Sequence, residues 1–211
     1  MKKAIIFDLD GTLWEVIDPT YKAVNVVAEK YHLKGISRET VCNTFGLDKE
    51  GVAKKLFPDV DLRDALRYVD ESSKLNVQAI IEYGGTVYPN LDVVLSHLKN
   101  HYQLFIVSNS SDIQYIEAFF RISGTKHYFR DYVAASQVGL SKGEAIQKII
   151  KEYNIDKGIY VGDTVIDLEA AKSASVDFIY AKYGFGDGVS AYYSINNITE
   201  LPSVIETIMK D

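Results

Sequence analysis

Short apolar runs recur along the chain, each about as long as one strand. The first covers residues 4–7, and similar runs follow at 104–107, 132–135, 159–161 and 176–180. Apolar runs without regular alternation are typical of strands that are buried on both faces of a parallel sheet. The sequence therefore predicts a parallel sheet built from these runs.

Between the later runs, apolar residues recur at helical spacing. Residues 91–98 and 113–120 show this spacing, and a third segment opens at Ser141 and Glu144 with the pattern of a capping box. Strands that alternate with helices give a parallel sheet covered on both faces. The predicted fold class is α/β, with a doubly wound, Rossmann-like parallel sheet.

Residues 14–87 differ from the rest, because they contain helical patterns and no convincing strand. We expect them to form an all-helical insert in an α/β core made of residues 1–13 and 88–211. Its first helix is expected to start at Asp18, as N-cap, and to end at Gly35. Further expected features are N-caps at Ser37 and Asp48, a helix over 62–83, and a hinge or a plain turn at Gly84 and Gly85.

Composition narrows the class of protein. The 211 residues carry a net charge of −6 and have no basic run, so neither nucleic acid nor a membrane surface is an expected partner. Cys42 is the single cysteine and fits a reducing compartment. The apolar stretch near Met1 is cut short by Asp8, and no stretch is apolar and long enough to span a bilayer. We expect a cytoplasmic protein that is a monomer or a homodimer.

Polar side chains that can carry chemistry follow the predicted strands at their carboxyl ends. In an open parallel sheet these ends line one crevice, where ligands bind. We therefore expect residues that are far apart in the sequence to meet in one site. The candidates are Asp8, Asp10, Ser108, Asn109, Lys142, Asp163 and Asp167.

Three carboxylates in one crevice would repel each other strongly unless a cation lay between them. For Asp8, Asp10 and Asp163, oxygen ligands without clustered His or Cys favour Mg²⁺. Lys142 supplies a second positive charge, and the Ser108 hydroxyl can bind phosphate oxygens. The sequence predicts a site at which Mg²⁺ and a phosphate group meet.

The first two aspartates can divide the chemistry of phosphate ester hydrolysis. If Asp8 attacks phosphorus, an aspartyl-phosphate forms and one difficult displacement becomes two easier ones. Asp10, two residues further on, can give a proton to the leaving oxygen and later take one from water. The predicted substrate is a small phosphorylated metabolite.

Four motifs in this order resemble the haloacid dehalogenase superfamily over essentially the whole chain. They are DLDGT at 8–12, Ser-Asn at 108–109, Lys142, and GDTVID at 162–167. The segment at 183–186 is similar to one carried by the phosphoglycolate-phosphatase-like members. The resemblance implies a phosphatase whose helical insert is a cap domain that closes over the site.

The resemblance also implies roles for individual residues. Asp8 becomes the nucleophile and Asp10 the acid/base, and Mg²⁺ is held by the Asp8 side chain, the Asp10 backbone carbonyl and Asp163. Asp167 is expected to support the metal, directly or through a water. Thr12 and Lys49 are the expected substrate contacts, Lys49 because the turn at 43–49 resembles the family's specificity loop.

Other reactions that share the first half of this chemistry stay open. They are those of a sugar-phosphate mutase and a pyrophosphatase, although the absence of a His between Asp10 and Tyr31 argues against the mutase. A non-hydrolytic signalling protein that carries a phospho-aspartate is a rival of another class. Such a protein preserves its phosphoryl group, so an acid/base two residues from the acceptor argues against it.

Overall fold

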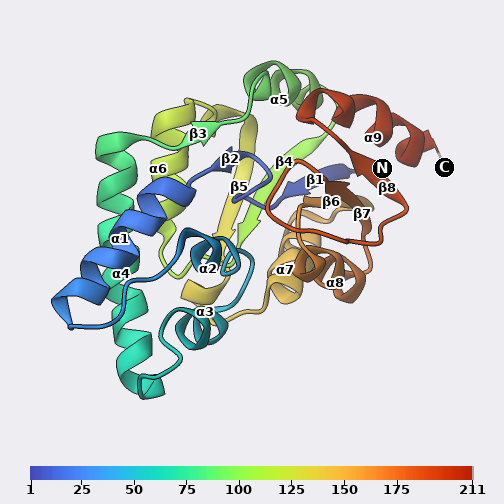
Figure 1. Ribbon diagram of the computed structural model, residues 1–211. Coiled ribbons are helices and arrows are strands. Elements are labelled where there is room, and N and C mark those ends of the chain that lie inside the picture. The colour runs from blue at the N-terminus through green and yellow to red at the C-terminus, as the bar shows by residue number, and fades with distance from the viewer. Residues whose placement is uncertain (211) are drawn as a thin grey trace.

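The computed structural model describes residues 1–210 and contains a six-stranded parallel sheet (Figure 1). The strand order is β5-β4-β1-β6-β7-β8, so the predicted α/β fold with a parallel sheet is confirmed. The strands are β1 Lys3–Phe7, β4 Gln103–Ser108, β5 Phe129–Ala134, β6 Lys157–Gly162, β7 Asp177–Ala181 and β8 Tyr193–Ile195.

Helices cover both faces of this sheet, as the doubly wound prediction requires. On one face, α5 (Leu91–Lys99), α6 (Ile113–Ser123) and α9 (Leu201–Lys210) share an apolar core with alternate residues of the strands. On the other face, α7 (Lys142–Tyr153) and α8 (Val165–Ala174) form a second core. The chain turns from one side of β1 to the other between β5 and β6, so β1 lies at the topological switch point, where ligands bind in such sheets.

Each of the five predicted strands is present, and the differences lie at the edges of the sheet. β5 starts at Phe129, three residues before the predicted run. The prediction missed these residues because they are polar or aromatic and none of them is fully buried. β8 was not predicted. It is a three-residue edge strand with one buried residue, Ile195, and is too short to leave an apolar run in the sequence.

Four helices lie between Glu15 and Thr86 in the sequence, and we call residues 17–83 the helical insert. They pack around an apolar cluster of their own that includes Val27, Val41, Leu56 and Val69. The predicted N-caps at Ser37 and Asp48 are confirmed, as is the helix from Leu62 to Tyr83. The four helices are α1 Ile17–Lys30, α2 Arg38–Cys42, α3 Lys49–Leu56 and α4 Leu62–Tyr83.

The predicted bounds of the first insert helix were wrong at both ends. The helix begins at Ile17, because the Glu15 carboxylate accepts a hydrogen bond from the Ile17 backbone N–H at 2.8 Å, and Asp18 caps nothing. It ends at Lys30, well before Gly35. His32 takes a left-handed conformation (φ 55°) that closes the helix, a position that glycine more often occupies.

A two-stranded antiparallel ribbon connects the insert to the sheet domain. It pairs β2 (Trp14–Glu15) with β3 (Thr86–Val87), and neither strand was predicted. Gly84 ends α4 with φ 82°, and β3 begins two residues later. Both connections to the insert therefore pass through one short ribbon.

Short 3₁₀ segments complete the secondary structure at Lys126–Tyr128, Ser136–Val138 and Ile198–Glu200. Within residues 1–210, no helix is both long enough and apolar enough to cross a membrane.

Candidate active site

Asp8 and Lys142 form a buried ion pair at the carboxyl end of β1. Lys142 Nζ donates to Asp8 Oδ1 at 2.8 Å and to Asp167 Oδ1 at 2.7 Å. Lys142 is the first residue of α7, whose capping box at Ser141 and Glu144 is present as predicted. Burial by itself would lower the pKa of Lys142, but Asp167 and Asp8 raise it above its ordinary value, so the lysine stays charged.

Asp167 is held at both carboxylate oxygens. It is the third residue of α8, and Oδ2 accepts hydrogen bonds from the backbone N–H and the hydroxyl of Thr164 in a capping box. Oδ1 accepts from Lys142 and, at 3.3 Å, from the Tyr160 hydroxyl. Asp167 therefore fixes the position of Lys142, and its direct binding to a metal stays a prediction.

Asp163 follows β6 and is enclosed by glycine backbone. Its Oδ2 accepts from the Phe185 N–H at 2.6 Å, while Oδ1 is buried without a hydrogen-bond partner. Gly11 has φ 77°, and a Cβ there would lie 2.1 Å from Asp163 Oδ2. A Cβ at Gly184 would lie 2.3 Å from the Asp163 Cβ, so the glycines at both positions make room for this carboxylate.

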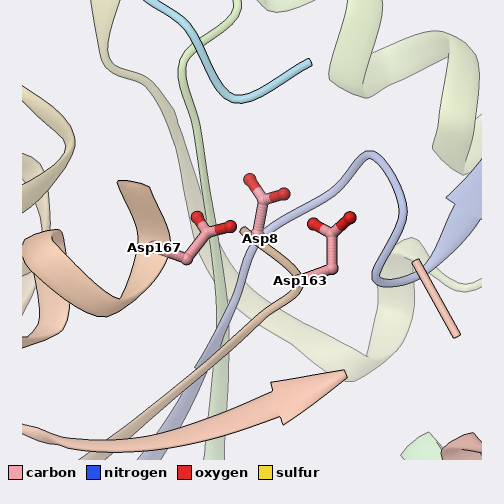
Figure 2. A group of neighbouring side chains, drawn as sticks. All are labelled: Asp8, Asp163 and Asp167. Carbon is pink, nitrogen blue, oxygen red and sulfur yellow. The ribbon is translucent and has the colours of Figure 1, made fainter. Parts of the chain in front are cut away.

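The carboxylates of Asp8, Asp163 and Asp167 converge at the end of the sheet, with Asp8 between the other two (Figure 2). One oxygen from each lies within 4.8 Å of the others. Burial raises the pKa of Asp8 well above its ordinary value, and burial together with Asp167 raises that of Asp163 to about 7. The unpartnered Asp163 Oδ1 and the all-oxygen donor set fit a hard divalent cation, which would relieve both the repulsion and the missing hydrogen bond.

Asp10 has surroundings unlike those of Asp8. Its Oδ1 accepts from Trp14 Nε1 and from the Tyr115 hydroxyl, each at 2.8 Å. Burial raises the pKa of Asp10 to about 6, while the hydrogen bonds from Tyr115 and Trp14 oppose that rise. Sequence reasoning missed Tyr115, because it lies on the buried side of α6 and fits the apolar pattern of that helix.

Ser108 is the last residue of β4 and Asn109 follows it, so both lie at the predicted carboxyl end of the strand, and both line the same cavity as Asp8. The Ser108 hydroxyl accepts from the Ser110 N–H at 3.2 Å. Asn109 Nδ2 donates to the Gly46 carbonyl at 2.8 Å, which joins the sheet domain to the insert. Thr12 is fully buried, its hydroxyl has no partner, and it is not among the cavity residues, so its substrate contact stays a prediction.

The cavity above Asp8 has a volume of about 140 Å³ and lies between the sheet domain and the helical insert. Insert residues that line it include Thr44, Lys49 and Asn76. Lys49 Nζ forms an ion pair with Asp70 at 2.6 Å. The structure thus brings Lys49 to the cavity, and its contact with substrate stays a prediction.

Comparisons with known proteins show the family of this chain. Residues 5–181 match the family model described as haloacid dehalogenase-like hydrolase. Phosphoglycolate phosphatases of Cupriavidus necator and Psychrobacter arcticus are each 23% identical, and the alignments cover 96% and 89% of this chain and 92% and 86% of theirs.

The fold is also shared with solved structures. A predicted phosphatase from Clostridium acetobutylicum superposes with a TM-score of 0.85 at 22% identity, over 98% of this chain and 99% of that one. A predicted phosphoglycolate phosphatase from Haemophilus somnus superposes with a TM-score of 0.85 at 18% identity, over 97% and 98%. The chain belongs to the haloacid dehalogenase-like hydrolases and resembles their phosphoglycolate phosphatases.

Proposed function

We propose that this hydrolase is a Mg²⁺-dependent phosphatase that cleaves a small organic phosphate monoester through an aspartyl-phosphate on Asp8. The observation that carries the proposal is the pair formed by Asp8 and Lys142 at the switch point, with Asp10 two residues away and an unpartnered Asp163 oxygen beside them. A buried carboxylate next to a lysine and facing a cavity has the charge and access that a nucleophile toward phosphorus needs.

The metal would be held by the Asp8 side chain, the Asp10 backbone carbonyl and Asp163. Asp167 would support it, directly or through a water. When bound, Mg²⁺ neutralises negative charge on the carboxylates and on the phosphate. The fit is supported by the oxygen-only donor set and by the raised pKa values of Asp8 and Asp163, since a cation at this place keeps both carboxyls ionised.

The reaction would proceed in two displacements at phosphorus. Asp8 attacks, the P–O bond to the alcohol breaks, and Asp10 protonates the leaving oxygen. A water that has lost its proton to Asp10 then attacks the aspartyl-phosphate, which releases inorganic phosphate and restores Asp8. Lys142 offsets the charge on the phosphate oxygens, and Ser108 with neighbouring backbone N–H groups can bind them.

The helical insert, together with the ribbon strands that flank it, would form a cap domain of residues 14–87 that excludes water and selects substrate. The insert lines the cavity opposite Asp8, and Asn109 and Gly46 join the two parts. The names of the relatives make phosphoglycolate the first ester to test, and a sugar phosphate is the second. Because the single cysteine, Cys42, is unpaired, we place this activity in a reducing compartment such as the cytoplasm.

The test is hydrolysis of p-nitrophenyl phosphate and of alkyl phosphates with and without Mg²⁺. We expect release of inorganic phosphate that needs Mg²⁺, stops with EDTA, and is abolished in Asp8→Asn for every ester. Full turnover in metal-free buffer, or an active Asp8→Asn variant, would overturn the proposal. Conversion of a sugar phosphate to its isomer without release of phosphate would point to a mutase instead.

A further inference from the structure

Within residues 1–210, the helical insert brings no unpaired cationic side chain to the cavity that faces Asp8. Among its lining residues within 1–210, the cationic side chains are Lys49 and Lys142. Lys142 is bound by Asp8 and Asp167, and Lys49 is paired with Asp70. A carboxylate on the substrate would therefore have to displace an existing ion pair.

Arginine is the residue best shaped to bind a carboxylate, because its guanidinium offers two parallel donors. The lining residues that the structure describes include no arginine. They do include Asp112 in addition to Asp8 and Asp10, so a second negative group on the substrate would face further negative charge. The phosphate has Lys142 and the expected metal as partners, but a substrate carboxylate would find no unpaired cation among the lining residues that the structure describes.

Two threonine hydroxyls that the insert brings to this cavity already donate their protons within the protein. The Thr20 hydroxyl donates to the Val16 carbonyl, and the Thr44 hydroxyl donates to the Val41 carbonyl, each at 2.7 Å. Since a carbonyl can only accept, each hydroxyl proton is committed, and what remains on each oxygen is capacity to accept. These groups are suited to a ligand that donates hydrogen bonds.

Asn76 extends this pattern. Its Nδ2 donates to the Thr20 oxygen at 3.0 Å, and this fixes the amide orientation, because the Thr20 proton is already directed to a carbonyl. Its Oδ1 is then left buried with no hydrogen-bond partner, on a side chain that lines the cavity and is only 7% exposed. An unsatisfied buried acceptor is costly, and a donor from a ligand would remove that cost.

We propose, resting on the phosphatase function above, that the substrate is the phosphate ester of a small neutral polyol rather than a phosphorylated carboxylic acid. Its hydroxyl groups donate to Asn76 and to the threonine oxygens near it. A cavity of about 140 Å³ is close in size to one that holds a six-carbon ring, which suits a polyol of a few carbons. Hydrolysis breaks the P–O bond to the polyol, which leaves with a proton from Asp10, and water supplies the fourth oxygen of the phosphate.

The first test compares three esters on the wild-type protein with Mg²⁺: rac-glycerol 1-phosphate, 2-phosphoglycolate and p-nitrophenyl phosphate. We expect kcat/KM for glycerol phosphate to exceed that for 2-phosphoglycolate by about tenfold or more, the scale of one or two buried hydrogen bonds. An equal or higher value for 2-phosphoglycolate overturns the proposal. If none of the three esters is hydrolysed, the phosphatase function itself fails.

The second test replaces the acceptor. Asn76→Leu should lower the ratio of kcat/KM for glycerol phosphate to that for p-nitrophenyl phosphate by about tenfold, because the aryl group has no hydroxyl to donate. Gln78→Leu makes the same exchange on an exposed position of α4 and should leave the ratio unchanged. An unchanged ratio in Asn76→Leu overturns the role of Asn76. If that variant does not fold, the wild-type comparison decides the substrate class alone.

Discussion

At the scale of single residues, two aspartates that are two residues apart in the motif have different surroundings. Asp8 faces a lysine, whereas Asp10 accepts two hydrogen bonds at one oxygen from neutral donors, Trp14 and Tyr115. These donors occupy Oδ1 and leave Oδ2 as the oxygen that can carry or take a proton. Asp10 is therefore oriented by side chains that the motif itself does not contain.

Variants of Asp10 and Tyr115 should affect esters with a poor leaving group more than esters with a good one, because only the poor leaving group needs a proton from Asp10. Asp10→Asn should lower kcat/KM by about 10²–10⁴ for an alkyl phosphate, whose leaving oxygen needs a proton, and much less for p-nitrophenyl phosphate. Tyr115→Phe should show the same selectivity on a scale of about tenfold, the worth of one hydrogen bond to a carboxylate. Steady-state kinetics with both esters measure this.

Tyr153→Phe is the matched control, because its hydroxyl donates to Asp131 and neither residue lines the cavity. It should leave both esters unaffected. Equal losses for the two esters in Tyr115→Phe would show that the hydroxyl supports packing and does not orient the acid.

At the scale of secondary structure elements, burial decided what the sequence could predict. The apolar runs of β1, β4 and β6 are hidden on both faces, so their positions were plain from the pattern. The paired strands at Trp14 and Thr86 are two residues long, and no periodicity can mark them. The predicted N-cap of α1 was Asp18, but the helix starts where the Ile17 N–H donates to the Glu15 carboxylate, a contact that the sequence pattern does not mark.

The site followed the same rule. Its motif residues were predicted because each follows a buried strand at the carboxyl end, and the topology brings those ends together. Two further groups of the site were missed. One is the backbone N–H of Phe185, and the other is Tyr115, which fits the apolar pattern of a core helix. Phe185 supplies only an N–H, and the single signal for it was the Gly-Phe-Gly segment at 184–186.

Replacing the insert by a short turn tests whether it selects the substrate without taking part in the chemistry. The register of the ribbon pairs Glu15 with Thr86, so an Asn-Gly turn can join these two residues in place of 16–85 while Trp14 keeps its bond to Asp10. We expect the shortened protein to retain hydrolysis of p-nitrophenyl phosphate and to lose discrimination among alkyl esters, because the proposed chemical groups lie outside the insert.

Circular dichroism should first show that the shortened protein is folded, since Ile80 and Val77 of α4 pack on the sheet domain. A folded variant that hydrolyses no ester at all would mean that the insert contributes a group to the chemistry. Unchanged discrimination would mean that selectivity resides in the sheet domain.

At the scale of the whole molecule, the fold holds like charges together in its interior. Asp8, Asp163 and Asp167 are buried at the switch point, with Lys142 as the neighbouring cation. In the metal-free protein, burial raises the pKa of Asp163 from 3.8 to about 7, and that of Asp8 rises too. Folding therefore favours the protonated form of these carboxyls.

The sign of the pH effect on stability follows from this. A carboxyl with a higher pKa in the folded state binds its proton more tightly there than in the unfolded chain. The stabilisation from this proton is fully present below about pH 4 and is lost as the pH rises through about 7. A bound cation takes the place of the proton, so it should matter most at high pH.

We therefore expect Mg²⁺ to raise the Tm by about 5–10 °C at pH 8 when its concentration is a hundredfold above its Kd at that pH, since that excess contributes about 2.7 kcal/mol to a chain of this length. The same concentration of Mg²⁺ should raise the Tm less at pH 5, where protons compete for the carboxylates. Asp163→Asn should remove most of the Mg²⁺ effect, because it takes away a charged ligand. Without metal, the Tm of this variant should also fall less between pH 5 and pH 8 than the Tm of the wild-type protein. Scanning calorimetry of both proteins with Mg²⁺ or EDTA measures this. A Mg²⁺ shift that is the same at both pH values, or undiminished in the variant, would contradict a cation site built on this carboxylate.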